Sequence, residues 1–594
     1  MDRDRNPRST TGARKRTAVL VVHGMGSQRP LDTVRGVVDA VWLDGNTSGT
    51  GDKRIWTHPE RSGIDDIDLS VITTNFVPDT DHRVIDFHEL YWAHLMSETL
   101  ATAVLLWLFE LARMGPRLKP AIAALYWATL VFLCALILSV TLLSVQAAVQ
   151  FAKLVALSSG DLDFDHDLHS LVFVVLISIF VTFFVVLLAA TLKGAGRLMA
   201  IFGGVSASIL LFALITYKAD AAETFTNILV PAIIALIVIK VTMDWWGVLG
   251  LLIVLVLSAI AGGVAWHFSP SVVENGRLPW SIMSFWSSIA ACCLIGLYLA
   301  LYASFLQPYL GDAARYFRNS PANVAVRREI RRQAVRMLEE LHLSGTHDRI
   351  VVVAHSLGTV VAYDMLRAYY SRINDALPDP SMLGAQFDAV DHGTLEKPAA
   401  RAAGREIIAE IAKAVEDAKQ RIGKNQPLPS DDKMLAWLVT DFITLGSPLT
   451  HALYLMCQGN TEAELEADFD RRTREREFPT CPPRKLDDDY RLTFQNPDTH
   501  QRTFHHGGQF ALTRWTNLYF PAVQLFWGDA IGGPVAPLFG KNVADCPVYT
   551  NVAKKDAFFS HVLYWSLAFG NTAPHIVTLK KAIDLADKGT ANDL

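Results

Sequence analysis

One short stretch decides the fold of this chain: Val351-Val352-Val353-Ala354-His355-Ser356-Leu357-Gly358-Thr359. Its β-branched run predicts a buried strand, and the residues from Thr359 to Arg367 are compatible with a helix. A serine between such a strand and helix, flanked by small residues two positions away on each side, matches the G-x-S-x-G nucleophile elbow, with Ala354 in place of the first glycine. The pattern predicts Ser356 as a nucleophile; the alternative is an ordinary Ser-Leu-Gly turn after a strand.

Composition sets the broad class of protein. The chain has 594 residues, enough for more than one domain. Hydrophobic residues make up 51% and the mean hydropathy is +0.24, which favours a membrane part. A net charge of −5 argues against a nucleic-acid partner. The 6 cysteines show neither metal-ligand spacing nor a disulfide framework, so we expect no metal. Residues 1–16 are polar and basic, unlike a secretory signal peptide.

Six apolar segments follow one another in the first half of the chain, at 121–150, 171–192, 198–217, 226–243, 247–267 and 281–306. Most have about the twenty apolar residues that one bilayer crossing needs. The alternative, buried helices of a soluble domain, does not suit six such segments in close succession. We therefore expect a six-span transmembrane region at 116–310.

The charges between these segments alternate. The basic connections are 113–119, 193–197, the surroundings of Lys240 and the segment after 311. The acidic connections are 161–167 and 220–223. Because basic loops stay in the cytoplasm, this alternation predicts both flanks of the region there. The apolar stretch 95–112 contains Glu98 and Glu110, and we expect it to be a helix at the membrane surface.

The two flanks, 1–115 and 311–594, read as two parts of one domain. In the first, an apolar strand from Thr17 ends in His23-Gly24-Met25-Gly26, where glycines expose backbone N–H groups to an oxyanion. A nucleotide-binding loop is the alternative, but Arg29 stands where G-x-G-x-x-G needs its last glycine. A second strand is predicted at 84–91.

The second part contains the elbow and further strand-like segments at 437–448 and 515–520, followed by 527–534 and 556–565. Strands separated by helical stretches predict an α/β fold with a doubly wound, mostly parallel sheet. Two polar insertions lie at 372–435, with an amphipathic helix from Ala402 to Ile422, and at 457–510. They suit substrate-selecting lids, or solvated surface insertions.

In this order, the elements resemble the α/β-hydrolase superfamily, and specifically its lipase-like serine esterases. The matching residues are His23-Gly24, Ala354 to Gly358, Thr444 to Pro448, Asp529 before Gly-Gly-Pro, and His561. The resemblance implies a serine esterase with a Ser-Asp-His chain order and no cofactor. One departure is that the membrane region stands before the elbow strand, where the family has a helix.

Each catalytic role has a candidate and alternatives. Ser356 is the expected nucleophile and His561 the base, with His505, His506 and His575 as competitors. Asp529 is the expected acid, followed by Asp441 and Asp545. The expected oxyanion donors are the N–H groups of Leu357 and Met25. The residues expected to support these loops are His23, Gly24, Gly26, His355 and Gly358.

Together these features predict a multi-pass protein of the plasma membrane, such as a bacterial inner membrane, with a cytoplasmic hydrolase domain. It would cleave carboxylic esters, and its tethering to the lipid bilayer favours a lipidic or acylated substrate. The rival interpretations are a channel, transporter or sensor regulated by a hydrolase-like domain, and a pseudoenzyme scaffold. The sequence leaves the acyl chain, the head group and the oligomeric state open.

Overall fold

The computed structural model describes residues 15–96 and 315–594, with gaps at 26–27, 46–52, 60–69, 79, 81, 318–320, 424–433, 460, 486–490, 499, 523–526, 530, 552 and 554–559. The six predicted spans lie outside the described residues. Within the described ranges, no helix combines the length and the apolar character needed to cross a membrane.

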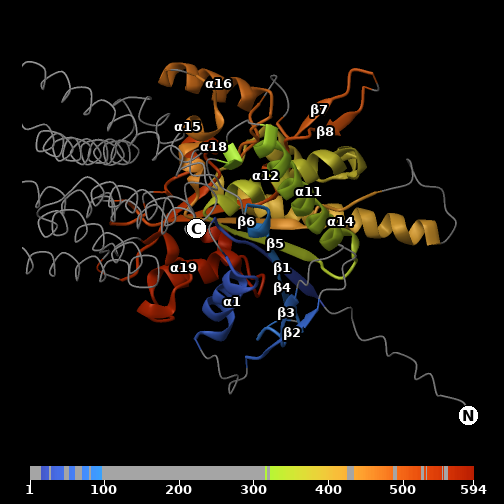
Figure 1. Cartoon of the computed structure of the whole chain (residues 1–594). Helices are drawn as coiled ribbons and strands as arrows, with labels where there is room; N and C mark the ends of the chain where they lie inside the picture. Colours follow the sequence, from blue (N-terminus) through green and yellow to red (C-terminus); the bar gives the residue numbers. More distant parts are fainter. Residues whose placement is uncertain are drawn as a thin grey trace, which may run out of the picture. The chain divides into compact units, whose positions relative to one another are not determined.

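The described residues build an eight-stranded sheet in the order β10-β9-β6-β5-β1-β4-β3-β2. Figure 1 labels the strands from β6 to β2. Six strands run parallel: β1 (Arg16–Val22), β4 (Val84–Leu90), β5 (Arg349–His355), β6 (Val439–Leu445), β9 (Arg514–Tyr519) and β10 (Ala544–Pro547). Strand β3 (Ser70–Thr74) pairs antiparallel with β4 and with the edge strand β2 (Ile55–Pro59). The predicted α/β class with a mostly parallel sheet is confirmed.

The sheet joins the two parts of the chain that 97–314 separates. Strand β1 lies between β4 and β5, and its register with β5 runs from Thr17 opposite Arg349 to Val22 opposite Ala354. The described residues before 97 and from 316 onward also belong to one compact unit. Described residues of both flanks therefore contribute to one sheet.

Helices cover both faces of this sheet. Alternate side chains of a strand point to opposite faces. Val19, Val21 and Val353 pack in one core with α1 (Asp32–Val38), the π-helical turn η1 (Asp39–Leu43) and α19 (Pro574–Ile583). On the other face, Trp515 packs against Tyr363 of α12 (Leu357–Ile373), and Phe442 packs against Trp515.

The remaining described elements lie between and beyond the strands. They are η2 (Ala93–Met96), α11 (Pro321–Leu343), η5 (Asn374–Ala376), η6 (Pro380–Met382), α13 (Ala385–His392), α14 (Lys397–Gly423), η7 (Pro448–His451), α15 (Ala452–Met456), α16 (Glu462–Arg474), β7 (Thr493–Gln495), β8 (Arg502–Phe504), α17 (Gln509–Leu512), α18 (Ala536–Phe539), η8 (Ser560–Val562), η9 (Leu567–Phe569) and η10 (Thr590–Asp593).

The predicted amphipathic helix from Ala402 to Ile422 lies within α14. This helix contacts β6 and β9, and Arg401 donates hydrogen bonds to the carbonyl of Trp515 and the hydroxyl of Thr516. The first insertion therefore contributes a cover for the sheet. The second insertion holds α16, which packs on α15, and the separate hairpin of β7 and β8.

Candidate active site

The nucleophile candidate sits on a strained turn. Strand β5 ends at His355 and α12 begins at Leu357, so Ser356 alone makes the connection. Its φ of 52° and ψ of −131° lie in a region that residues with a side chain rarely adopt. Such strain persists only where the surrounding structure enforces it, and it recurs at functional sites. Ser356 is buried at this turn, 1% exposed.

Close packing enforces the turn. A Cβ atom at Gly358 would lie 2.2 Å from the carbonyl oxygen of His23, at the end of β1. A Cβ atom at Gly24 would lie 3.0 Å from the Cβ of Ser356. Both glycines therefore allow the β1 loop and the elbow to approach more closely than side chains would permit.

The structure brings Ser356, His561 and Asp529 together from three separate segments. The Nε2 of His561, in η8, lies 2.9 Å from the Oγ of Ser356. Its Nδ1 lies 2.9 Å from Oδ2 and 3.0 Å from Oδ1 of Asp529. The backbone N–H of Ser560 donates to the carbonyl of Gly528, which ties the histidine loop to the aspartate loop. These distances suit a nucleophile, a base and an orienting acid.

Asp529 is held as a carboxylate. Burial, the largest single influence, acts to raise its pKa, but His561, the backbone N–H of Gly532 and the hydroxyl of Tyr564 together lower the pKa to about 2. The backbone N–H groups of Ile531 and Gly532 donate to Oδ1 at 2.8 and 2.9 Å. The hydroxyl of Tyr564 donates to Oδ2 at 2.7 Å. Each of these bonds stabilises the charged form.

Tyr564 is a part of this site that sequence reasoning missed. It follows His561 by three residues, in the predicted 556–565 segment, and is fully buried. Its hydroxyl also accepts a hydrogen bond from the N–H of Phe520, just after β9. Tyr564 thereby fixes the Asp529 carboxylate relative to the sheet.

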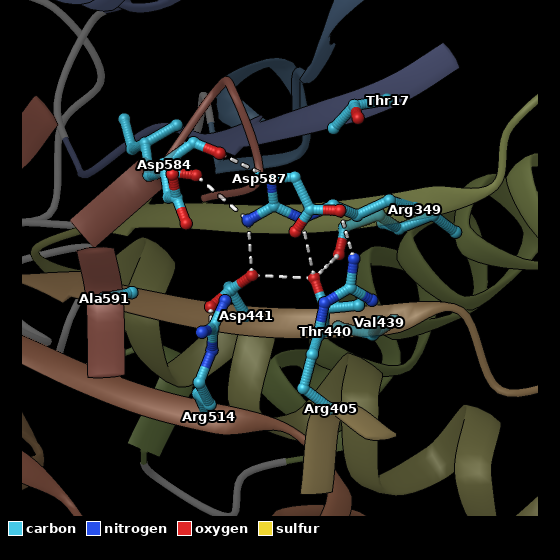
Figure 2. Close-up of polar contacts among 12 residues, drawn as sticks. Thr17, Arg349, Arg405, Val439, Thr440, Asp441, Arg514, Asp584, Asp587 and Ala591 are labelled. Atoms are coloured by element: carbon cyan, nitrogen blue, oxygen red, sulfur yellow. Dashed lines mark hydrogen bonds and ion pairs between the residues drawn. The ribbon is translucent and has the colours of Figure 1, made fainter. Parts of the chain in front are cut away.

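Asp441, the alternative acid, lies in a different environment (Figure 2). Its Oδ1 accepts from Nε of Arg514 at 2.7 Å, and its Oδ2 accepts from Nη2 of Arg349 at 2.7 Å. All three side chains are buried. Asp441 belongs to the amino-terminal half of β6, whereas Ser356 follows the carboxyl end of β5, and the two strands are parallel. Asp441 therefore neutralises buried arginines near the amino-terminal ends of the parallel strands, and Ser356 lies at their carboxyl ends.

The other competitors are also engaged elsewhere. Asp545 accepts from Asn517 and from the backbone N–H groups of Val535 and Ala536. The rings of His505 and His506 lie against each other, 4.3 Å apart. Nε2 of His575 contacts the carbonyl of Ser566. Among the described histidines, hydrogen bonding to the Ser356 hydroxyl is seen for His561.

The expected oxyanion donors lie on both sides of the nucleophile. Leu357 opens α12, and the first N–H groups of a helix have no intrahelical acceptor. Met25 is buried beside Gly24, whose contact with Ser356 brings this loop to the nucleophile. Gly26 lies outside the described residues. The start of a helix and the loop after β1 therefore both lie beside Ser356.

His23 fixes the conformation of this loop. Its Nε2 accepts the backbone N–H of Trp92 at 3.0 Å, so Nδ1 carries the hydrogen and donates to the carbonyl of Gly24 at 2.6 Å. Burial lowers the pKa of His23 to about 4, which keeps the ring neutral. The indole N–H of Trp92 donates to the carbonyl of His23 at 3.1 Å, and the two rings are stacked. Trp92 is a second contributor that sequence reasoning missed.

His355 supports the histidine loop. Its Nε2 lies 2.8 Å from the carbonyl oxygen of His561. Burial, and then the nearby His561, lower the pKa of His355 to about 3, so the neutral ring donates this hydrogen bond. The ring also packs edge-on against Trp565. His355 therefore acts on the position of His561 and does not contact the Ser356 hydroxyl.

No metal centre is seen in the described ranges: no group of three or more His, Cys, Asp or Glu side chains there is arranged to hold an ion. Comparison of the chain with protein-family models, curated proteins and solved structures found no match.

Proposed function

We propose that this chain is a serine hydrolase that cleaves carboxylic esters. The observation that carries the proposal is the chain of contacts from Ser356 Oγ through both nitrogens of His561 to Asp529. A structural histidine needs only one such partner, whereas a general base needs both an acceptor position facing the nucleophile and an orienting carboxylate.

The proposed reaction has two halves. Ser356 Oγ attacks the ester carbonyl carbon while its proton passes to Nε2 of His561. The tetrahedral oxyanion accepts hydrogen bonds from the N–H groups of Leu357 and Met25. When the C–O bond breaks, the alcohol leaves with the proton from His561, and the acyl group stays on Ser356. Water then attacks the acyl carbon and gives its proton to His561, which returns it to Ser356 Oγ as the carboxylic acid leaves.

The architecture supports membership of the α/β-hydrolase superfamily. Three features support this. A strained serine joins a parallel strand to a helix, as in the nucleophile elbow of that superfamily. A second donor loop follows a neighbouring strand, and the chain order is Ser356, Asp529, His561. The inserted region at 97–314 stands between β4 and β5, which are separated in the sheet only by β1.

The predicted membrane tethering favours a lipidic or acylated substrate. Strand β4 leads through Trp92 and η2 toward the predicted spans, and α11, which follows them, packs on η2. Strands β4 and β5 are both parallel to β1, so β4 ends on the same side of the sheet as β5, which Ser356 follows. We place this hydrolase domain on the cytoplasmic side of a plasma membrane, as the charges of the connections predict.

The proposal is tested with the purified full chain in neutral detergent. Wild type should hydrolyse 4-nitrophenyl butanoate, and Ser356→Ala should lose several orders of magnitude in kcat. Ser381→Ala, at an exposed serine of η6, is the matched control and should keep wild-type turnover. Equal hydrolysis by wild type and Ser356→Ala would contradict the proposal. If the chain is a channel or sensor without catalytic activity, neither wild type nor Ser356→Ala should hydrolyse the ester.

A further inference from the structure

A charged cavity lies beside the helix that begins at the nucleophile. Its volume is about 550 Å³, and it is bordered by α11, α12, α15 and α16. Five arginines line it in the part of the chain that the structure describes: Arg327, Arg331, Arg367, Arg471 and Arg472. Three carboxylates accompany them: Asp364, Asp468 and Glu477. The lining therefore carries an excess of two positive charges.

The acids hold the arginines in place without neutralising all of them. Asp364 is buried and accepts hydrogen bonds from the hydroxyl of Tyr316 at 2.8 Å and from Nη2 of Arg331 at 2.7 Å. Arg367 also pairs with Asp364, at 3.4 Å. On the opposite wall, Arg472 pairs with Glu477. The single carboxylate of Asp364 thus pairs with two guanidinium groups, those of Arg331 and Arg367.

Arg331 keeps an unused donor in this setting. Its Nε is buried and has no hydrogen-bond partner among the described residues, although Nη2 is bound to Asp364. A guanidinium group presents five N–H donors in a planar fork that fits phosphate and carboxylate oxygens in pairs. The Arg331 side chain as a whole is 35% exposed and lines the cavity, so its other N–H groups are available to an anion there.

The cavity is close to the nucleophile along α12. Val360, in its lining, follows Ser356 by four residues, and Arg367 follows it by eleven. At 1.5 Å per residue, these positions lie about 6 and about 16 Å from Ser356 along the helix axis. These separations are within the length of one small ester molecule.

We propose that this cavity binds the phosphate group of an acyl-ester substrate whose ester lies at Ser356. The inference rests on the proposed esterase function and specifies its substrate class. A phosphate monoester carries about −1.5 to −2 charges at neutral pH, opposite in sign to the net charge of the lining, where Arg471 also pairs with Glu475 outside it. The phosphate belongs either to a lipid head group or to a soluble phosphorylated ester.

Matched substrates separate the phosphate from the rest of the molecule. The full chain in neutral detergent is given 1-hexadecanoylglycerol 3-phosphate or uncharged 1-hexadecanoylglycerol, and then the corresponding butanoyl pair. We expect kcat/KM to favour the phosphorylated member of a pair by about tenfold or more. A preference in both pairs indicates a soluble source of phosphate as well, and a preference in the hexadecanoyl pair alone indicates a lipid.

Variants tie the preference to the cavity. Arg331→Gln and Arg471→Gln should reduce the preference to about threefold or less, while hydrolysis of the uncharged ester stays near wild type. Arg471 is half-exposed on α16, so this change spares the fold if Arg331→Gln disturbs it. Arg332→Gln is the control, because Arg332 is exposed, pairs with Glu329 and lies outside this cavity. Equal rates for charged and uncharged esters, or a preference that survives both cavity variants, would overturn the inference.

Binding separates this inference from the esterase proposal. In the Ser356→Ala background, equilibrium binding of radiolabelled 1-hexadecanoylglycerol 3-phosphate should be about tenfold tighter than that of 1-hexadecanoylglycerol. Adding Arg331→Gln or Arg471→Gln should remove the difference. If no ester is hydrolysed but this difference is found, the cavity assignment stands and the esterase proposal fails. Equal binding of both lipids overturns the cavity assignment regardless of activity.

Discussion

Gly358, in the first turn of α12, lies directly against the carbonyl oxygen of His23, which a Cβ atom at Gly358 would approach to 2.2 Å. These residues belong to the two parts of the chain that 97–314 separates. The contact therefore sets the distance between the nucleophile elbow and the loop that carries the second proposed oxyanion donor. A change in the position of the elbow would therefore also displace the loop that follows β1.

Gly358→Ala tests this contact. The added methyl group meets backbone atoms that cannot rotate away, so we expect a loss of about 1–3 kcal/mol in stability and a large fall in ester hydrolysis. Thermal unfolding and kcat/KM of the full chain measure the two effects. Gly384→Ala is the control, because its Cβ atom would lie 3.5 Å from the nearest atom, an ordinary contact with Glu410. Similar behaviour of the two variants would contradict the account.

The two buried aspartates should fail in different ways. Asp529→Asn should preserve folding but lower kcat by about 10⁴-fold, because the acid holds the imidazole tautomer and stabilises its charged form. Asp441→Asn should instead destabilise the fold by about 3–5 kcal/mol, because Arg349 and Arg514 lose their shared buried carboxylate. Turnover per folded molecule and unfolding midpoints separate these effects.

A double variant strengthens this test. His561→Ala combined with Asp529→Asn should be hardly slower than His561→Ala alone, because residues that act as a unit are strongly non-additive. If Asp441→Asn removed turnover without unfolding the protein while Asp529→Asn were nearly silent, the assignment of the acid would be wrong.

Several features could be predicted from the sequence. The strands, the elbow and Asp529 have local patterns, and His561 has the late position that the Ser-Asp-His chain order requires. The runs 17–22 and 351–355 are β-branched, and Asp529 precedes Gly-Gly-Pro in a loop after a strand. Asp441 could already be ranked lower because it stands at the start of its strand, not after its end.

Other contributors could not be predicted because their roles depend on register and packing between distant segments. Nothing near Trp92 indicates that its N–H meets His23, 69 residues earlier. The link from Tyr564 to Asp529 likewise requires the positions of both loops. The arginine cavity combines residues of α11, α12 and α16, and only the folded chain brings them together.

Glu89 gives the stability a defined pH dependence. This buried carboxylate accepts the backbone N–H of Leu31 at the start of α1, and its Oε1 has no hydrogen bond among the described residues. Burial, the largest influence, raises its pKa from 4.5 to about 7. The folded state therefore holds a proton that the unfolded state releases between these values. Stability from this group is complete below pH 4.5 and is lost as pH rises through 7.

Glu89→Gln removes this titration. Relative to wild type, the variant should gain stability as the pH rises through the window, by on the order of 3 kcal/mol at most. Unfolding midpoints of both proteins, measured across the window in one detergent, give the difference. Since other titrating groups are common to both proteins, parallel curves would show that Glu89 is not the source.

The shared sheet constrains the number of membrane crossings. Because β1 and β5 are neighbours, both flanks must lie on one side of the proposed membrane, so the predicted number of crossings between them has to be even. A cysteine introduced by Ser159→Cys should react with an impermeant thiol reagent on intact cells, and one introduced by Ser430→Cys should not. The parent chain, with its 6 native cysteines, sets the background. The reverse pattern would contradict the six-span topology.

The most direct test of the central claim is covalent labelling of the full chain with a fluorophosphonate, followed by mass spectrometry of the modified peptide. The account predicts one adduct on Ser356, lost in Ser356→Ala and much slower to form in His561→Ala, because the histidine must take the serine proton. Ser381→Ala should label like wild type. A folded wild-type protein that stays unlabelled, or an adduct on another serine that persists in Ser356→Ala, would contradict the claim that Ser356 is an activated nucleophile.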